Sequence, residues 1–104
     1  MELKKAIFPK KGDYYLKNIF EKIDESIQVQ CGTVFLNKGD ELPLKTLEYH
    51  EVAYLVSGKL MSYTKEQEYI MNPSDLIYIN RKEVRATKTL EDSKIIFFLY
   101  KNVT

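Results

Sequence analysis

The chain has 104 residues, an ordinary size for one domain, and its 44% hydrophobic and 30% charged residues exclude intrinsic disorder. Sixteen Lys and Arg against fifteen Asp and Glu leave a formal net charge of +1, so we expect neither nucleic acid nor a membrane as partner. The single cysteine, Cys31, excludes an internal disulfide, and neither a signal peptide nor a long apolar run is evident. These features indicate a soluble, cytoplasmic protein in which Cys31 is a buried structural residue.

Residues 1 to 26 have a different pattern from the rest of the chain. Asp13 is placed to cap a short helix, and four apolar residues then follow at helical spacing: Leu16, Ile19, Phe20 and Ile23. We therefore predict a short N-terminal helical segment. Residues 1 to 26 are expected to form an extension that packs on a single domain of residues 27 to 104.

The remainder of the chain is typical of an all-β fold. Residues 27 to 36 alternate in hydrophobicity and contain Gly32, a plausible site for a bend within a strand. Turn signals then recur at short intervals: "NKGDELP", "SGK", "TKEQ", "MNPSD", "NRKE" and "LEDS". The apolar run "KIIFFLY" is expected to be a core strand. This spacing predicts a β-sandwich or a barrel.

The order of these signals resembles one superfamily. Six residues, "VAYLVS", separate Glu51 from Gly58, Gly39 precedes an extended segment, and the turn at 73–75 precedes "LIYIN". Over residues 27 to 100 this arrangement is similar to the cupins, which are double-stranded β-helix barrels of the jelly-roll type. The resemblance implies a site deep in the barrel, where three histidines and one glutamate of typical cupins bind a divalent metal.

This chain departs from the cupin pattern at three of those four positions. Lys45 and Leu47 stand at the first two histidine positions, Glu51 matches the glutamate, and Arg85 stands at the third histidine position. Lys and Arg offer only hydrogen-bond donors and repel a cation, whereas metals bind through lone pairs. We therefore expect no metal and no other cofactor.

The stretch "TLEYHEVAYLVSGKL" carries a narrower resemblance, to the ethanolamine-utilisation cupins, which also lack the histidine pair. That resemblance implies a role in ethanolamine-type catabolism and an acetate-kinase-like activity. Ala53 replaces an acidic residue of the family stretch, and no phosphate-binding Gly-rich loop is present. The resemblance therefore bears mainly on the fold and its pocket.

The candidate site consists of Lys45, Glu51 and Arg85, which the resemblance places inside the barrel. Their excess positive charge favours a small, anionic ligand such as a carboxylate or phosphate. A structural salt-bridge network, or cations that simply reach water, would explain them equally well. Two neighbouring cations should lower the pKa of Glu51, which favours a binding or accessory protein over catalysis. The alternative is a metal-independent isomerase, lyase or acetate-kinase-like enzyme with Glu51 as general base, assisted by Lys45 or His50.

Two further residues are candidates for ligand binding. His50 should point away from Glu51 in a regular strand, so it is either a surface residue or an acid/base at the pocket rim. Tyr54 could line the pocket, although tyrosine is also simply favourable in strands. A homodimer is expected as well, because "KIIFFLY" would be hazardous as an exposed edge strand.

Overall fold

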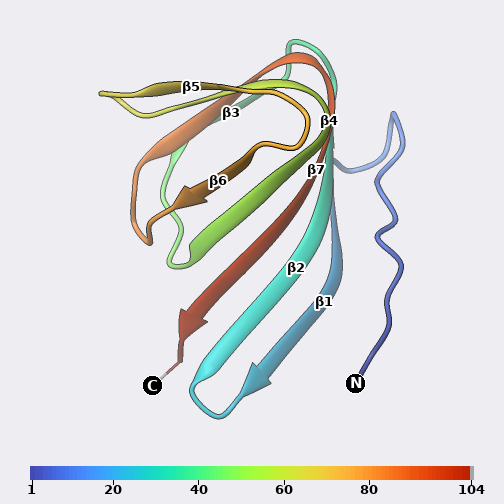
Figure 1. The fold of residues 1–104 in the computed structure, drawn as a ribbon, viewed down its shortest axis with the longest axis vertical. Coiled ribbons are helices and arrows are strands. Elements are labelled where there is room, and N and C mark those ends of the chain that lie inside the picture. Colours follow the sequence, from blue (N-terminus) through green and yellow to red (C-terminus); the bar gives the residue numbers. More distant parts are fainter. Residues whose placement is uncertain (104) are drawn as a thin grey trace.

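The computed structural model describes residues 1–103, which form seven antiparallel strands and no helix (Figure 1). The strands are β1 (Leu16–Asp24), β2 (Ile27–Leu36), β3 (Glu41–Lys45), β4 (His50–Tyr63), β5 (Glu68–Met71), β6 (Leu76–Ile79) and β7 (Arg85–Asn102). No helix in this part of the chain could cross a membrane. Residue 104, the end of the predicted domain, lies outside the described residues. The predicted all-β class is confirmed.

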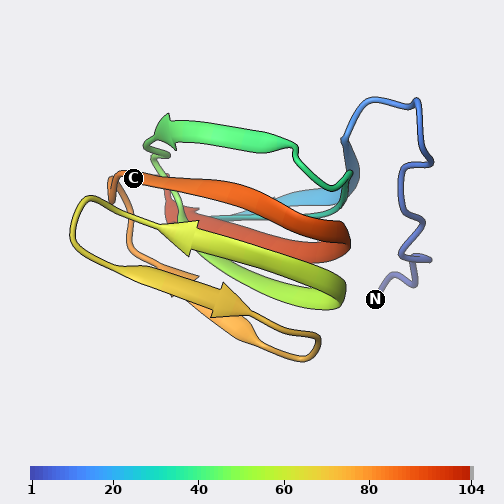
Figure 2. The same cartoon turned by 90° about the horizontal axis from the view of Figure 1, so that it is seen from above.

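Two long strands, β4 and β7, pair with each other and bend, so each contributes to two layers. The first sheet has the order β1, β2, β7, β4 and β6, and uses the first half of β4 and the second half of β7. The second sheet has the order β3, β7, β4 and β5, and uses the other halves. Figure 2 shows the second sheet in this order, from green β3 to gold β5. The two layers form a double-stranded β-helix.

Gly58 makes the bend of β4 possible. Its φ of +98° lies in the left-handed region, which side chains with a Cβ rarely adopt. A Cβ at Gly58 would also collide with the backbone of Asp92 and Ser93 in β7. The pairing register between β4 and β7 shifts here, between Leu55 and Leu60. Glycine is therefore required where the two strands turn together from one sheet into the other.

The core fills the space between the sheets. Its members are buried apolar residues on the inner faces of β2, β4, β5 and β7: Val34, Leu36, Ala53, Leu55, Leu60, Met71, Ile95, Phe97 and Leu99. Strand alternation explains this set, because every second residue of a strand points to the same face. Leu55 is fully buried at the centre of β4. Seven of these core residues also line a cavity between the sheets that includes Glu51 and Arg85.

The predicted N-terminal helix is wrong, because Leu16–Asp24 is strand β1 and pairs with the edge of β2. A bulge between Asn18 and Phe20 interrupts the alternation of β1, so its apolar residues have a spacing that resembles that of a helix. The carboxylate of Asp13 closes a turn by accepting a hydrogen bond from the Lys10 amide at 2.9 Å. Pairing with β2 supplies the backbone hydrogen bonds that a helix would have made internally.

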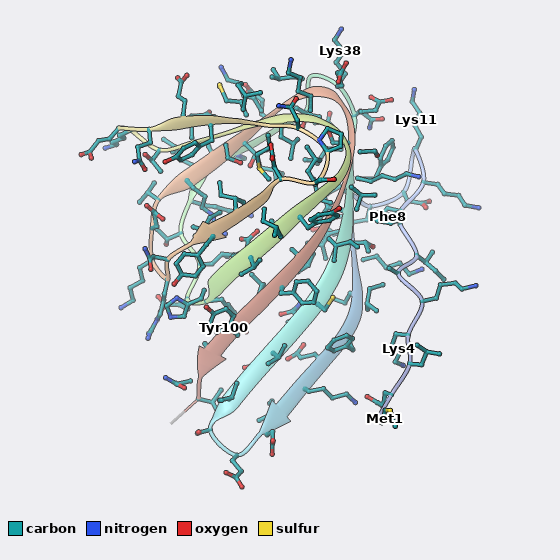
Figure 3. All side chains as sticks on the ribbon, viewed as in Figure 1. Met1, Lys4, Phe8, Lys11, Lys38 and Tyr100 are labelled. Atoms are coloured by element: carbon teal, nitrogen blue, oxygen red, sulfur yellow. The ribbon has the colours of Figure 1, made fainter. Side chains whose placement is uncertain are left out.

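Residues before β1 run along the outer face of the first sheet, where Figure 3 shows Lys4, Phe8 and Lys11 beside β1. The Thr33 hydroxyl donates a 2.6 Å hydrogen bond to the Ile7 carbonyl, and Glu2 forms an ion pair with Lys22. Cys31 is buried under this segment, and burial raises the pKa of its thiol. The thiol is therefore protonated at neutral pH, as expected for a structural cysteine.

Candidate ligand-binding cavity

The four positions that the sequence aligns with cupin metal ligands come together in the structure. Lys45 from β3, Leu47 from the following loop, Glu51 from β4 and Arg85 from β7 all line one cavity of about 130 Å³ between the two sheets. Lys45 and Arg85 are direct partners in the antiparallel register of β3 and β7. Motif order along the chain therefore predicted a real spatial cluster.

Glu51 and Arg85 form an ion pair that joins the two layers. Glu51 lies on the inner face of the first sheet, and Arg85 begins the part of β7 that belongs to the second sheet. Arg85 Nη2 donates a hydrogen bond of 2.5 Å to Glu51 Oε1. The side chain of Arg85 is 9% exposed and that of Glu51 is 17% exposed, so water screens this ion pair weakly.

The ion pair with Glu51 does not use all the hydrogen-bond donors of Arg85. Its Nη1 atom is buried and has no hydrogen-bond acceptor among residues 1–103. Lys45 lies at the exposed margin of the cavity and forms no ion pair within the described chain. A buried donor without an acceptor is costly, and more so when it carries charge. The site therefore has unused capacity to donate hydrogen bonds to an anion.

The pKa of Glu51 is raised, mainly because burial penalises its charged form. Arg85 and then Lys45 act in the opposite direction but do not outweigh burial. The expectation that the two cations would lower this pKa is wrong. Sequence spacing identified the neighbouring cations but could not show how deeply the carboxyl group is buried.

The rest of the cavity wall is mostly apolar, with three hydroxyl groups that the sequence analysis missed: Tyr15, Ser62 and Thr87. Thr87 lies two residues after Arg85 on the same strand face, so strand alternation could have identified it. Tyr15 comes from the loop before β1, where the helix prediction concealed its position. The cavity thus offers a charged end and an extended apolar wall.

The other two predicted ligand-binding residues do not join this cluster. His50 lies on the outer face of the first sheet, where its Nδ1 is 2.9 Å from the Tyr78 hydroxyl and its ring stacks on Tyr100. Tyr54 lies on the same outer face, with its hydroxyl 3.5 Å from Ser74 Oγ. His50 and Glu51 point in opposite directions, as strand alternation predicted.

The cavity does not fit the metal site of typical cupins. Among the four aligned positions only Glu51 offers lone pairs, and its carboxylate already accepts a hydrogen bond from Arg85. Lys45 and Arg85 would repel a cation. Within residues 1–103, no group of three or more His, Cys, Asp or Glu side chains could hold a metal ion. We derive no chemistry through a metal at this site.

Comparison with known proteins supports the fold. No protein-family model matches the sequence, and no curated protein is significantly similar to it. A protein of unknown function from Streptococcus pyogenes has a TM-score of 0.72 and 12% identity, covering 97% of this chain and 96% of that one. An RmlC-like cupin with a double-stranded β-helix fold, from Methanocaldococcus jannaschii, has a TM-score of 0.69 and 10% identity, covering 98% and 90%.

Enzymes are among the similar structures. The DMSP lyase of Ruegeria pomeroyi has a TM-score of 0.69 and 13% identity, covering 86% of this chain and 48% of that one. This chain therefore spans about half of the enzyme's length. At these identities the comparisons establish a cupin fold, and the function has to be argued from the cavity.

Proposed function

We propose that this cupin-fold chain binds a small organic acid in the cavity between its sheets. The observation that carries the proposal is Arg85 Nη1, a buried cationic donor without an acceptor in the described chain. A carboxylate supplies the missing acceptor and a negative charge together. The apolar wall then accommodates the carbon skeleton of the acid.

The charges of the cavity favour a monoanion. Lys45 and Arg85 carry two positive charges and Glu51 one negative charge, and no other ionised side chain of the described chain lines the cavity, so its formal charge is +1. Burial raises the pKa of Glu51, so the neutral form of its carboxyl group is more favourable in the cavity than in water. Protonation of Glu51 would increase the positive charge of the cavity further. A single carboxylate balances the site, whereas a cation or a neutral ligand leaves the positive excess of the cavity uncompensated.

A second candidate function is proton transfer to or from the bound acid. A carboxyl group with a raised pKa is the usual requirement for a general acid or base near neutral pH, and Glu51 meets it. Its hydrogen bond to Arg85 limits this role, because the pair already engages one of its oxygens. We therefore propose binding without turnover as the main function of the cavity, with an isomerase or lyase reaction as the alternative.

The experiment is calorimetric titration with acetate, propionate and butyrate, with the matching neutral amides as controls. We expect the acids to bind much more tightly than the amides, because only the acids add the negative charge that offsets the +1 excess of the cavity. Lys45→Met should weaken acid binding several-fold and still fold, since Lys45 is exposed. Lys65→Met is the matched control, because Lys65 lies in the exposed turn after β4, away from the cavity lining. Equal affinity for acids and amides would contradict the proposal, and conversion of a bound acid would favour the enzyme.

The pathway and location are proposed on the sequence alone. The stretch from Thr46 to Leu60 is similar to ethanolamine-utilisation cupins, which supports a role in the catabolism of small molecules in the cytoplasm. Acetate is then a natural first probe, since the same resemblance implied an acetate-kinase-like activity. The cavity geometry itself supports acid binding. Phosphoryl transfer is not supported in the same way, because residues 1–103 contain no carboxylate cluster that could bind magnesium.

We also propose that the outer face of the first sheet packs against a second copy of the chain. Four large side chains on this face are 38–66% exposed: Leu76, Tyr78, Phe98 and Tyr100. At roughly 100 Å² each, they expose about 400 Å² of mainly apolar surface. One partner of a standard interface contributes roughly 800 Å², a little over half of it apolar. The patch is therefore of the size that a homodimer needs.

The structure changes the reason for expecting a dimer. The run "KIIFFLY" lies in β7, which has a strand neighbour on each side, so it is no exposed edge. Alternation instead directs Phe98 and Tyr100 to the outer face while Phe97 and Leu99 enter the core. The proposed contact is therefore between sheet faces.

A further inference from the structure

A second cavity adjoins the first and opens between β5 and β6. These two strands pair with opposite halves of β4, so β5 is an edge of the second sheet and β6 an edge of the first. Figure 1 shows them separated on the same side of β4. The space between them, which we call the seam cleft, measures about 220 Å³. It lies where the two layers diverge.

The seam cleft and the cavity between the sheets meet at Arg85. Four residues line both: Ser62, Ile77, Ile79 and Arg85. Arg85 is buried, and its Nη2 atom donates a hydrogen bond to Glu51 while Nη1 has no acceptor in the described chain. The guanidinium group is therefore a shared wall, and one carboxylate bound to it can carry substituents into either space.

The two spaces differ in chemistry. The wall of the inner cavity is mainly apolar, whereas the seam cleft is lined mostly by hydroxyl, amide and carboxyl side chains, among them Thr64, Gln67, Tyr69, Asn80 and Glu83. Glu83 and Arg85 are the only ionised side chains of the described chain that line the cleft, and their formal charges cancel. A polar lining without net charge matches an uncharged group that forms several hydrogen bonds.

Resting on the proposed function, we propose that the ligand is an organic acid with an uncharged, hydroxyl- or amide-bearing substituent that occupies the seam cleft. The carboxylate lies at Arg85 and accepts a hydrogen bond from Nη1. The polar substituent lies between β5 and β6, where Gln67 and Tyr69 at the exposed rim can bind it. The inner cavity accommodates an apolar substituent where the acid has one. The cleft thus determines which acids are preferred.

The test compares two probes, butyrate and threonate, which are four-carbon monocarboxylates that differ in hydroxylation. Calorimetry measures the affinity of each for the wild-type protein and for Gln67→Ala and Tyr69→Phe. Each variant should weaken threonate binding about fivefold, the effect of losing one hydrogen bond, and leave butyrate binding unchanged. Glu66→Gln is the matched control, because Glu66 lies in the same exposed turn as Gln67 but does not line the cleft.

The outcomes separate this inference from the proposed function. If both acids bind but neither cleft variant changes threonate affinity relative to the Glu66→Gln control, the cleft inference is overturned and acid binding stands. If Gln67→Ala weakens butyrate and threonate equally, the inference is also overturned, because the effect is then not specific for hydroxyl groups. If neither acid binds, the proposed function fails and this inference fails with it.

Discussion

The two faces of the first half of β4 show how one strand can build two different environments. Glu51 and Ala53 face the cavity and core, while His50, Val52 and Tyr54 face outward among aromatic side chains. The inner face combines a buried ion pair with apolar neighbours, and the outer face combines exposed rings with a His–Tyr hydrogen bond. Neighbouring residues in the sequence therefore belong to separate sites. Strand alternation assigns each residue to one of the two faces, whereas contact with a charged partner and depth of burial give each face its chemistry.

The largest expected effect tests the inner face. Glu51→Leu removes the acceptor of Arg85 Nη2 and leaves a buried cation without a partner, so the free energy of unfolding should fall by about 3–5 kcal/mol. Glu51→Gln also removes the negative charge but keeps an acceptor oxygen in the same place, so it should cost less than Glu51→Leu. Urea-induced unfolding measures both variants. His50→Leu is the control on the outer face, and a loss as large as that of Glu51→Leu would remove the distinction between the faces.

The outer face is tested by self-association. Phe98→Lys places a charge on the exposed aromatic surface, next to the N-terminal segment, and should convert a homodimer into a monomer, because the charge would be buried without a partner. Light scattering and analytical ultracentrifugation measure the change. Ile70→Lys is the matched control, since Ile70 is a similarly exposed apolar residue on β5 of the other sheet. A wild-type protein that stays monomeric at high concentration would contradict the proposed dimer.

The smallest expected effect is a pH dependence that belongs to Glu51. Its folded-state pKa lies above the ordinary value of 4.5, so between these two values the folded state binds more protons than the unfolded state. Stability therefore falls as pH rises above about 4.5 and becomes level above the folded-state pKa. The measurement is the unfolding free energy of wild type minus that of Glu51→Gln across this range. A difference that increases with pH would show that Arg85 outweighs burial, so that the pKa is lowered.

Local patterns in the sequence determined much of the barrel. Alternation along residues 27 to 36 and the repeated turn signals predicted an all-β sandwich or barrel, because strands and turns depend on local side-chain chemistry. The spacing from Glu51 to Gly58 carried a resemblance to the cupins, and that resemblance implied the double-stranded β-helix. The same motif order predicted that Lys45, Glu51 and Arg85 lie together, and the structure confirms that these residues share one cavity. Alternation also separated His50 from Glu51 correctly.

Tertiary structure decided the rest, because those features depend on partners that are distant in the chain. Leu16–Asp24 became a strand since the edge of β2 was available for pairing, which outweighed a spacing that resembled a helix. The pKa of Glu51 is raised because the core surrounds the carboxyl group, and no count of nearby cations could reveal that burial. The seam cleft exists only because β5 and β6 pair with different halves of the bent β4. Burial and the divergence of the two sheets are properties of the assembled layers, which local sequence does not specify.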